Sequence, residues 1–246
     1  MVMTIIAIED LSFTWPDGTV ALRGVSLSVE RGGSLGLIGR NGAGKSTLLL
    51  HLNGILHGSG AVRFGGRPVE EWSAQRLRAA VGLLFEDPDD QLFMPTVLDD
   101  VTFGPLNHGL SPKEARARAE VALASVGAEG LEDRPPHHLS AGQKRRVALA
   151  CVLVMEPTVL VLDEPVAGLD PDGREAVIEL LAELPQTKVI ASHDLDMVAQ
   201  LCDRVAVLDG GQVHATGDAR ELLRDEPLLR KHGLRVPLTL EQELRP

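Results

Sequence analysis

The residues with the most specific chemical pattern are Gly-Arg-Asn-Gly-Ala-Gly-Lys-Ser-Thr at positions 39–47. They fit G-x-x-x-x-G-K-[ST], the pattern of a phosphate-binding loop, in which glycines let the backbone approach an anion closely. The N–H groups at the start of the following helix, together with the helix dipole, favour a polyphosphate. The residues predicted to contact it are Gly39, Asn41, Gly42, Ala43, Gly44, Lys45, Ser46 and Thr47.

Lys45 and Ser46 have distinct predicted roles within this loop. The lysine ammonium should reach the outer phosphates, and the serine hydroxyl should hold Mg²⁺. An apolar run, Ser34 to Ile38, predicts a buried strand before the loop, and Lys45 to Leu56 has leucines at helical spacing after it. A glycine turn that happens to enter a helix is the simpler interpretation, but the agreement of strand, loop and helix favours phosphate binding.

Two carboxylates and a histidine follow other apolar runs. Asp163 and Glu164 end the run Thr158 to Leu162, and His193 comes directly after Val189 to Ser192. Carboxylates at the end of a buried strand are costly unless they meet a cation or take part in proton transfer. Solvated turn carboxylates and a structural histidine are the alternatives. The strand pattern places all three at the same end of the sheet as the glycine loop.

Two further segments give weaker signals. Leu-Ser-Ala-Gly-Gln at positions 139–143 opens a predicted helix, Lys144 to Met155, and any such helix start could bind an anion. Trp15 ends the predicted strand Ile5 to Trp15, beside the turn at Pro16-Asp17-Gly18. It could stack on an adenine or form the edge of the core, and its position alone does not decide between them.

The elements that must position these residues alternate between strands and helices. Further strands are predicted at Val20 to Val29, Ala61 to Phe64, Val81 to Phe85, Val205 to Leu208 and Gln212 to Ala215, and further helices at Glu71 to Arg78, Val177 to Leu184 and Leu222 to Gly233. Alternation predicts an α/β fold with a mostly parallel sheet and helices on both faces. The first two strands, joined by a tight turn, predict a small antiparallel β layer beside it. Ligands of such sheets bind beyond the carboxyl ends of the strands.

The segment from about Asp87 to Glu156 has a different character. It contains helical patterns and no strong strand signal. Ser111 is a predicted N-cap with Pro112 at the first helical position, and the helix from Ala115 to Val126 should end at Gly127. The sequence therefore predicts a helical subdomain at 87–156, inserted into an α/β core formed by residues 1–86 and 157–246.

Composition narrows the class of protein. The 246 residues carry a formal net charge of −11, which disfavours broad binding to nucleic acid. Cys151 and Cys202 lie in apolar runs without metal-ligand spacing, so we expect buried thiols in a reducing compartment. No signal peptide is visible and no apolar run reaches the roughly 20 residues that span a bilayer. We therefore expect a cytoplasmic chain that is held at any membrane by another protein.

The ordered set of motifs resembles that of the ATPase subunits of ABC transporters, over nearly the whole chain. Residues 39–47 match the Walker A loop, Leu139 to Gln143 the LSGGQ signature, and Leu160 to Glu164 Walker B with its catalytic glutamate. Gly168-Leu169-Asp170 matches the D-loop, and His193 the switch histidine. The resemblance implies a phosphate-loop NTPase core in a single domain, 1–246, and gives Trp15 the place of the adenine-stacking aromatic.

Residues 81–93 resemble more narrowly the energy-coupling-factor class, which includes the cobalt and nickel uptake ATPases. Members usually read F-Q-[ND]-P-[ED]-D-Q-L-F where this chain reads Phe-Glu-Asp-Pro-Asp-Asp-Gln-Leu-Phe. Glu86 therefore replaces the Q-loop glutamine, and its carboxylate can bind Mg²⁺ while adding negative charge near the γ-phosphate. Ala141 replaces the first glycine of the signature, where its Cβ could crowd a phosphate contact.

The resemblance also implies a mechanism. Two subunits, identical or not, face head to tail and enclose two ATP molecules, each between one chain's phosphate loop and the other chain's Ser140, Gly142 and Gln143. Glu164 acts as general base, Asp163 holds Mg²⁺ through water, and His193 contacts the γ-phosphate, while Lys45 stabilises developing charge. Hydrolysis reopens the dimer, and this opening motion is passed to a transmembrane subunit through the loop from Glu86 to Phe93. The chain is thus expected on the cytoplasmic face of the cell membrane as a peripheral protein that drives uptake of a metal ion or vitamin.

Two other interpretations belong to different classes. A cytosolic ABC ATPase without transport, such as an iron–sulfur assembly scaffold subunit, has a similar length, but the acidic segment Asp87 to Gln91 favours the uptake class. A nucleic-acid ABC protein would need a long coiled-coil insertion or two tandem ATPase domains, and neither is present in these 246 residues. A pure binding module is disfavoured because both Glu164 and His193 are in place.

Overall fold

A six-stranded sheet with the order β10-β9-β3-β8-β7-β6 forms the centre of the computed structural model, which describes residues 3–243. The five strands from β9 to β6 are parallel, and β10 pairs antiparallel with β9 at one edge. The strands are β3 (Ser34–Ile38), β6 (Val81–Leu84), β7 (Val159–Asp163), β8 (Thr187–Ser192), β9 (Arg204–Asp209) and β10 (Gln212–Asp218). The ends 1–2 and 244–246 of the predicted domain lie outside the described residues.

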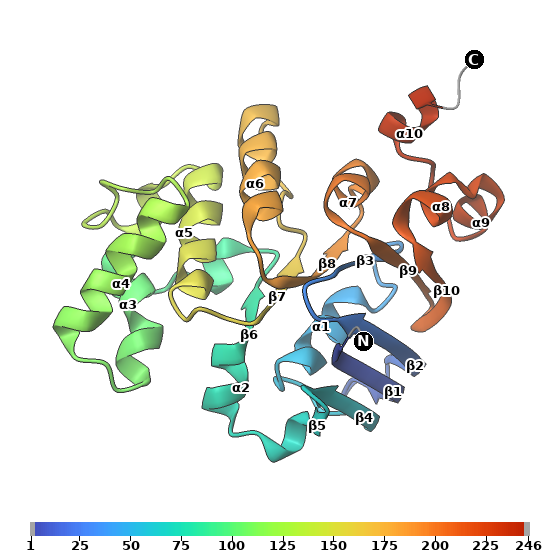
Figure 1. Ribbon diagram of the computed structural model, residues 1–246, viewed down its shortest axis with the longest axis horizontal. Coiled ribbons are helices and arrows are strands. Elements are labelled where there is room, and N and C mark those ends of the chain that lie inside the picture. The colour runs from blue at the N-terminus through green and yellow to red at the C-terminus, as the bar shows by residue number, and fades with distance from the viewer. Residues whose placement is uncertain (1–2, 244–246) are drawn as a thin grey trace.

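Alternate residues of the central strands enter two different hydrophobic cores. In β7, Val159 and Val161 join one core, whereas Leu160 and Leu162 join the other. Both faces are covered, as a parallel sheet requires: α6 (Pro171–Glu183) and α7 (Leu195–Leu201) lie on one face, and α1 (Lys45–Leu52) on the other (Figure 1). The predicted mostly parallel α/β fold is confirmed.

A second sheet of four antiparallel strands covers α1, in the order β2-β1-β4-β5. It confirms the predicted small β layer, and β4 and β5 extend it beyond the two strands that the sequence indicated. Its strands are β1 (Thr4–Thr14), β2 (Val20–Glu30), β4 (Ser59–Phe64) and β5 (Arg67–Pro68), with η1 (Val69–Glu71) and α2 (Ala74–Ala80) following.

Residues 87–156, all of which the structure describes, contain helices and connecting loops but no strand, and they form one end of the molecule (Figure 1). The predicted cap at Ser111 is present as a full capping box with Glu114. The elements here are η2 (Pro88–Asp90), α3 (Val97–Asn107), α4 (Pro112–Ser125), η3 (Pro136–His138) and α5 (Ala141–Leu153). The exact subdomain boundaries at 86/87 and 156/157 stay a prediction.

Several predicted helix limits were wrong for reasons visible in the caps. α5 and α6 begin three and six residues before their predicted starts, because Ser140 and Asp170 accept hydrogen bonds from the first turns. The predicted helix Leu222 to Gly233 is two helices, since Asp225 caps a new helix that has a proline in its first turn. The remaining elements are α8 (Ala219–Arg224), α9 (Glu226–Lys231) and α10 (Leu238–Glu243).

The two cysteines differ in exposure. Cys202 is buried, as predicted, and burial raises the pKa of its thiol to about 12. Cys151 is only partly buried, which corrects the expectation, because it lies on the side of α5 that borders a groove.

Among residues 3–243, no helix has both the length and the apolar character to cross a membrane.

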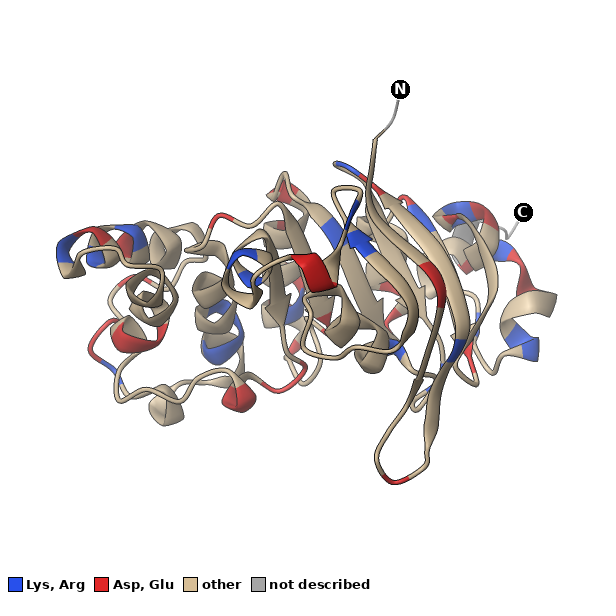
Figure 2. Cartoon of the chain, turned by 90° about the horizontal axis from the view of Figure 1, so that it is seen from below, with Lys and Arg blue, Asp and Glu red and all other residues tan. Residues whose placement is uncertain are grey.

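Lys and Arg residues alternate with Asp and Glu residues along the chain rather than gathering in one part of it (Figure 2). Acidic residues exceed basic ones by 35 to 24 over the sequence. This distribution is unlike the clustered basic face that nucleic-acid phosphates attract. That this chain does not bind nucleic acid remains a prediction.

Candidate functional site

The glycine loop lies between β3 and α1, at the carboxyl end of the central sheet. Its glycines are needed for packing as well as for an incoming anion. Gly44 adopts φ +103°, and a Cβ there would lie 2.6 Å from the carbonyl oxygen of Ala21 in β2. Gly39 faces the carbonyl of Leu208 in β9 in the same way. Close contacts with β2 and β9 therefore leave no room for a side chain at Gly44 or Gly39.

Lys45 is held on the inner side of this loop. Its side chain is buried at 7% exposure, and its ammonium donates to the carbonyl oxygens of Gly39 (2.8 Å) and Arg40 (3.3 Å). The first turn of α1 also carries Ser46, which is exposed, and Thr47, which is buried. A cation therefore lies at the point where the backbone N–H groups of the loop converge.

Asp163, the last residue of β7, has an unsatisfied carboxylate. It is 8% exposed, and its Oδ1 has no hydrogen-bond partner among the described residues. Burial raises the pKa of Asp163, the Ser46 hydroxyl opposes this shift, and the negative charges of Glu86 and Glu164 add to it. Buried carboxylates are stabilised by a cation, so the donor set of Asp163, Ser46 and Glu86 fits a hard, oxygen-binding ion such as Mg²⁺.

Glu164 follows in a constrained backbone conformation. Its φ of +43° lies in the left-handed region, which non-glycine residues occupy only when their surroundings hold them there. Its carboxylate accepts hydrogen bonds from the Ser192 hydroxyl (2.8 Å) and the His193 backbone N–H (3.0 Å). The His193 ring Nδ1 lies 2.9 Å from Glu164 Oε2, and this ring is largely exposed. β8 thus fixes the carboxylate at the end of the sheet.

One cavity of about 480 Å³ brings most of the predicted residues together. Trp15 borders it on the side of the β layer, half-buried and in edge contact with Phe13 at 5.1 Å between ring centroids. The predicted residues that line it are Trp15, Asn41, Gly42, Ala43, Gly44, Lys45, Ser46, Thr47, Glu86, Asp163, Glu164 and His193. Gly39 lies at the foot of the loop and lines a neighbouring pocket instead.

The signature residues are not part of this cavity. Ser140 and Gln143 bind each other as a capping box: Gln143 N donates to Ser140 Oγ at 3.3 Å and Ser140 N donates to Gln143 Oε1 at 3.0 Å. Gly142 has open space around its α-carbon. The start of α5 therefore offers free backbone N–H groups away from this chain's own glycine loop.

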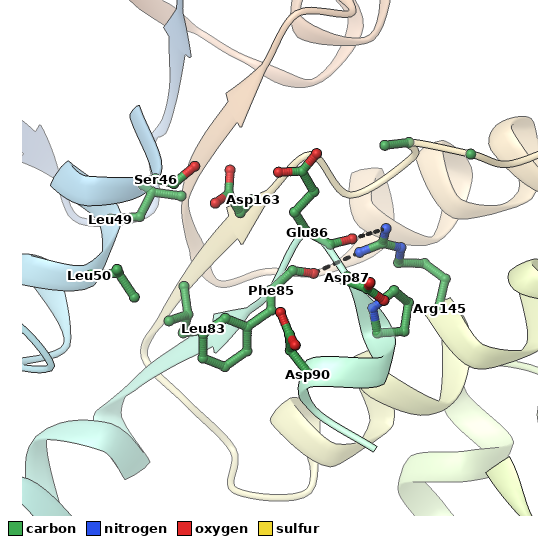
Figure 3. Close-up of a pocket in the computed structure, with 13 residues that line it drawn as sticks. Ser46, Leu49, Leu50, Leu83, Phe85, Glu86, Asp87, Asp90, Arg145 and Asp163 are labelled. Carbon is green, nitrogen blue, oxygen red and sulfur yellow. Dashed lines mark hydrogen bonds between the residues drawn. The ribbon is translucent and has the colours of Figure 1, made fainter. Parts of the chain in front are cut away.

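Sequence reasoning missed the role of Arg145. This side chain is 2% exposed, and its two terminal nitrogens donate to the carbonyl oxygens of Phe85 (2.8 Å) and Glu86 (2.6 Å), as Figure 3 shows. Burial lowers the pKa of Arg145, while Asp87, Glu86, Asp163 and Glu164 favour its charge. It ties α5 to the segment after β6. The only signal in the sequence was a run of basic residues on an otherwise apolar helix.

Comparison with known proteins agrees with this geometry. The family model described as ABC transporter matches residues 22–167. A putative ABC transporter ATP-binding protein of Gloeobacter violaceus is 51% identical over 96% of this chain and 98% of its own. An energy-coupling factor transporter ATP-binding protein, EcfA, of Methanothermobacter thermautotrophicus is 48% identical over 96% of this chain and 78% of its own.

A solved structure is similar over almost the whole fold. It is cbiO1 from Clostridium perfringens, described as part of the ABC transporter complex cbiONQ. The TM-score is 0.81 at 42% identity, and the match covers 99% of this chain and 100% of that one. With the glycine loop, Asp163, Glu164 and His193 around one cavity, these matches show that the chain belongs to the ABC transporter family, as an ATP-binding subunit that hydrolyses ATP.

Proposed function

We propose that this chain hydrolyses ATP at the cavity between its glycine loop and β7 to drive solute uptake through an energy-coupling-factor transporter. The observation that carries the catalytic part is the convergence of Lys45, Asp163, Glu164 and His193 at the ends of adjacent elements. The names of the EcfA relatives and of the cbiONQ component support the transport part.

In this proposal each residue of the cavity has one task. Lys45 and the loop N–H groups hold the phosphates and stabilise the charge that develops on them during transfer. Glu164 accepts a proton from the attacking water, and His193 contacts the terminal phosphate from its exposed position beside Glu164. Trp15 stacks on the adenine at the opposite end of the cavity. Ser192 and the His193 N–H keep the Glu164 carboxylate oriented.

Ser46, Asp163 and Glu86 are the residues that would hold Mg²⁺. The unpartnered Oδ1 of Asp163 supports this assignment, since a buried carboxylate oxygen without a donor is otherwise costly. Bound there, Mg²⁺ would neutralise charge on the phosphate oxygens.

Glu86→Gln tests the departure in the Q-loop. Removing this carboxylate takes one negative charge from beside Asp163, so the Mg²⁺ concentration for half-maximal ATPase activity should rise about three- to tenfold, roughly 1 kcal/mol. The measurement is a Mg²⁺ titration of ATPase rate at saturating ATP. Glu129→Gln, an equal change at an exposed position in the helical part, serves as control. If the Mg²⁺ titration of Glu86→Gln matched that of the parent chain, Glu86 would not lie close enough to the metal ion to affect its binding.

The start of α5 supports a head-to-tail dimer in this proposal. Its free N–H groups form a second phosphate-seeking helix start, but they lie outside the cavity that the same chain forms. A second ATPase subunit, identical or related, would bring its own Ser140, Gly142 and Gln143 to this cavity and accept the same in return. ATP would then be held between the two subunits.

The membrane partner is proposed to dock at an apolar groove of about 370 Å³ between the core and the helical part. Phe93 is 63% exposed at its edge and meets Phe103 edge-on at 5.1 Å. Asp100 accepts hydrogen bonds from the backbone N–H groups of Phe93 and Met94, both at 3.0 Å, and so holds this segment out. Gln91 Nε2 donates to the Ala148 carbonyl at 2.7 Å, which links the groove to α5.

Phe93→Glu tests the docking and transport parts together. It should leave the ATPase rate of the isolated subunits within about twofold, because Phe93 lies outside the nucleotide cavity. Loss of an exposed aromatic anchor should reduce co-purification with the transmembrane subunits at least about tenfold and abolish ATP-dependent uptake.

Val121→Glu is the matched control, since Val121 is 71% exposed but lies on α4, away from the groove. Wild-type uptake by Phe93→Glu would exclude this groove as the docking site. Co-purification with a soluble scaffold instead of membrane proteins would favour a cytosolic iron–sulfur assembly role, which the similarity to EcfA and cbiO1 does not favour.

The proposed solute and location of the chain follow from its similarity to the energy-coupling-factor class. A cobalt or nickel ion or a vitamin is the proposed solute, and the chain would work as a peripheral protein on the cytoplasmic face of the cell membrane. Reconstituting the intact complex in vesicles and comparing ATP-dependent uptake of cobalt, nickel and candidate vitamins would identify the solute.

A further inference from the structure

Three side chains of types that can ligate a metal meet outside the set of residues that line the nucleotide cavity. Asp209 ends β9, His214 lies on β10, and His232 follows α9. Each can offer one ligand atom, and the three atoms lie within 4.8 Å of one another. No other group of this kind occurs among the described residues.

The local structure aims these side chains at one another. The pairing of β10 with β9 is irregular between Val213 and Ala215, so His214 occupies a bulge, and bulges redirect a side chain. The His214 and His232 rings lie 4.5 Å apart, tilted by 35°. His232 is 4% exposed with its Nδ1 3.0 Å from Asp209 Oδ2, and His214 Nε2 lies 3.2 Å from the Asp209 carbonyl oxygen.

One pair of these donors already has the separation that a transition-metal ion requires, and the third lies within 4.8 Å of both. Imidazole and carboxylate ligands bind Zn²⁺, Ni²⁺ or Co²⁺ at about 2.0–2.1 Å, which puts neighbouring donors about 3.0–3.5 Å apart. The Asp209–His232 pair already meets this spacing. His214 is exposed and Asp209 partly so, which leaves an entry path and open coordination positions for water.

The cluster adjoins the glycine loop through two contacts. Gly211, two residues after Asp209, donates its N–H to the Ala43 carbonyl at 3.1 Å. Gly233, directly after His232, packs on Arg40: a Cβ there would lie 2.8 Å from Arg40 Cδ. An ion that joins the hairpin to the end of α9 would therefore brace both supports of the loop. If it changes nucleotide affinity, the nucleotide changes metal affinity by the same factor.

We propose that Asp209, His214 and His232 form a site for a divalent transition-metal ion, separate from the Mg²⁺ site. The site links the β9–β10 hairpin to the end of α9, next to residues that contact Arg40 and Ala43 of the glycine loop. It holds the ion through two imidazoles and one carboxylate and needs no other chain.

The test uses the full chain without a histidine tag, stripped of metal and kept in millimolar Mg²⁺ so that the nucleotide cavity does not compete. Titration with CoCl₂ should show one equivalent bound, by calorimetry and by a visible d–d absorption band. His214→Ala should weaken Co²⁺ binding at least about tenfold and remove the band. Loss of a residue that only hydrogen-bonds to a metal ligand already lowers metal affinity about 10–100-fold, and loss of the ligand itself should lower it at least as much. Asp209→Asn should do the same, and both positions are exposed enough to spare the fold.

Two control variants each remove a histidine that has one potential metal ligand beside it but lies outside the proposed site. His57→Ala removes an exposed histidine whose Nδ1 lies 3.8 Å from Glu70 Oε1, and His137→Ala removes one of two neighbouring histidines whose rings meet edge-on. Both variants should bind Co²⁺ as the parent chain does. Absence of binding by the parent chain at millimolar CoCl₂, or equal binding by His214→Ala, would overturn the proposal.

Discussion

Glu164→Gln should bind ATP with nearly unchanged affinity while hydrolysing it about 10²–10⁴-fold more slowly, the usual contribution of a positioned general base. An amide has the shape of the carboxylate. Its oxygen can still accept from the His193 N–H, now 3.0 Å from Oε1, and its NH₂ group can donate to the Ser192 hydroxyl oxygen, now 2.8 Å from Oε2. It has no basicity to take a proton from water. The fold should survive, so the loss should appear in turnover alone.

Single-turnover and steady-state ATPase assays, with nucleotide binding followed in parallel, measure this effect. Size-exclusion chromatography with ATP and Mg²⁺ should also show a dimer that persists, because the enclosed nucleotide is not consumed. Glu175→Gln makes the same change at a carboxylate 59% exposed on α6 and should leave the rate intact. If Glu164→Gln hydrolysed ATP at the full rate, Glu164 would not be the general base and another group would have to act as the base.

Arg145→Met should lower the free energy of unfolding by about 2–4 kcal/mol, because two part-buried carbonyls lose charged donors from a buried side chain at once. For a domain of this size that corresponds to a fall in Tm of roughly 4–16 °C. The Phe85 and Glu86 carbonyls would then be free to move relative to α5. Because small displacements of site residues are costly, ATP hydrolysis measured well below the lower Tm should fall at least about tenfold.

Arg146→Met is a close control. Arg146 donates to the Gly127 carbonyl at 3.0 Å from a more exposed position, so its loss should cost under about 0.5–1 kcal/mol. Thermal melts and ATPase rates of both variants, at one protein concentration, give the comparison. Equal melting and equal rates for the two variants would mean that Arg145 merely packs against the Q-loop segment.

The features that could be predicted are those that depend only on residues close together in the sequence. The cap at Ser111-Pro112 and the glycine loop each lie within one short segment, so residue types and spacing were enough to predict them. Helix starts were less certain, since Ser140 and Asp170 act as caps only where the chain actually turns. The residue type of Ser140 is equally compatible with a cap and with an anion ligand, so the sequence does not separate the two.

Contacts between distant segments could not be predicted in the same way. Arg145 meets a carbonyl 60 residues earlier, and Ser192 holds a carboxylate 28 residues before it. Neither partner is near enough in sequence for periodicity to reveal it. The metal-ligand cluster depends on a bulge at His214, which no alternation of apolar and polar residues announces.

By itself, the sequence determined the order of the motifs, the alternation of buried strands with helices, and hence the chemistry available at the ends of those strands. The tertiary structure alone decided how close those groups come, that the signature helix start lies outside its own chain's cavity, and that a buried arginine joins α5 to the Q-loop. The physical reason is that local signals follow from the geometry of a few consecutive residues, whereas these distances depend on how the whole sheet stacks its strands and packs its two cores.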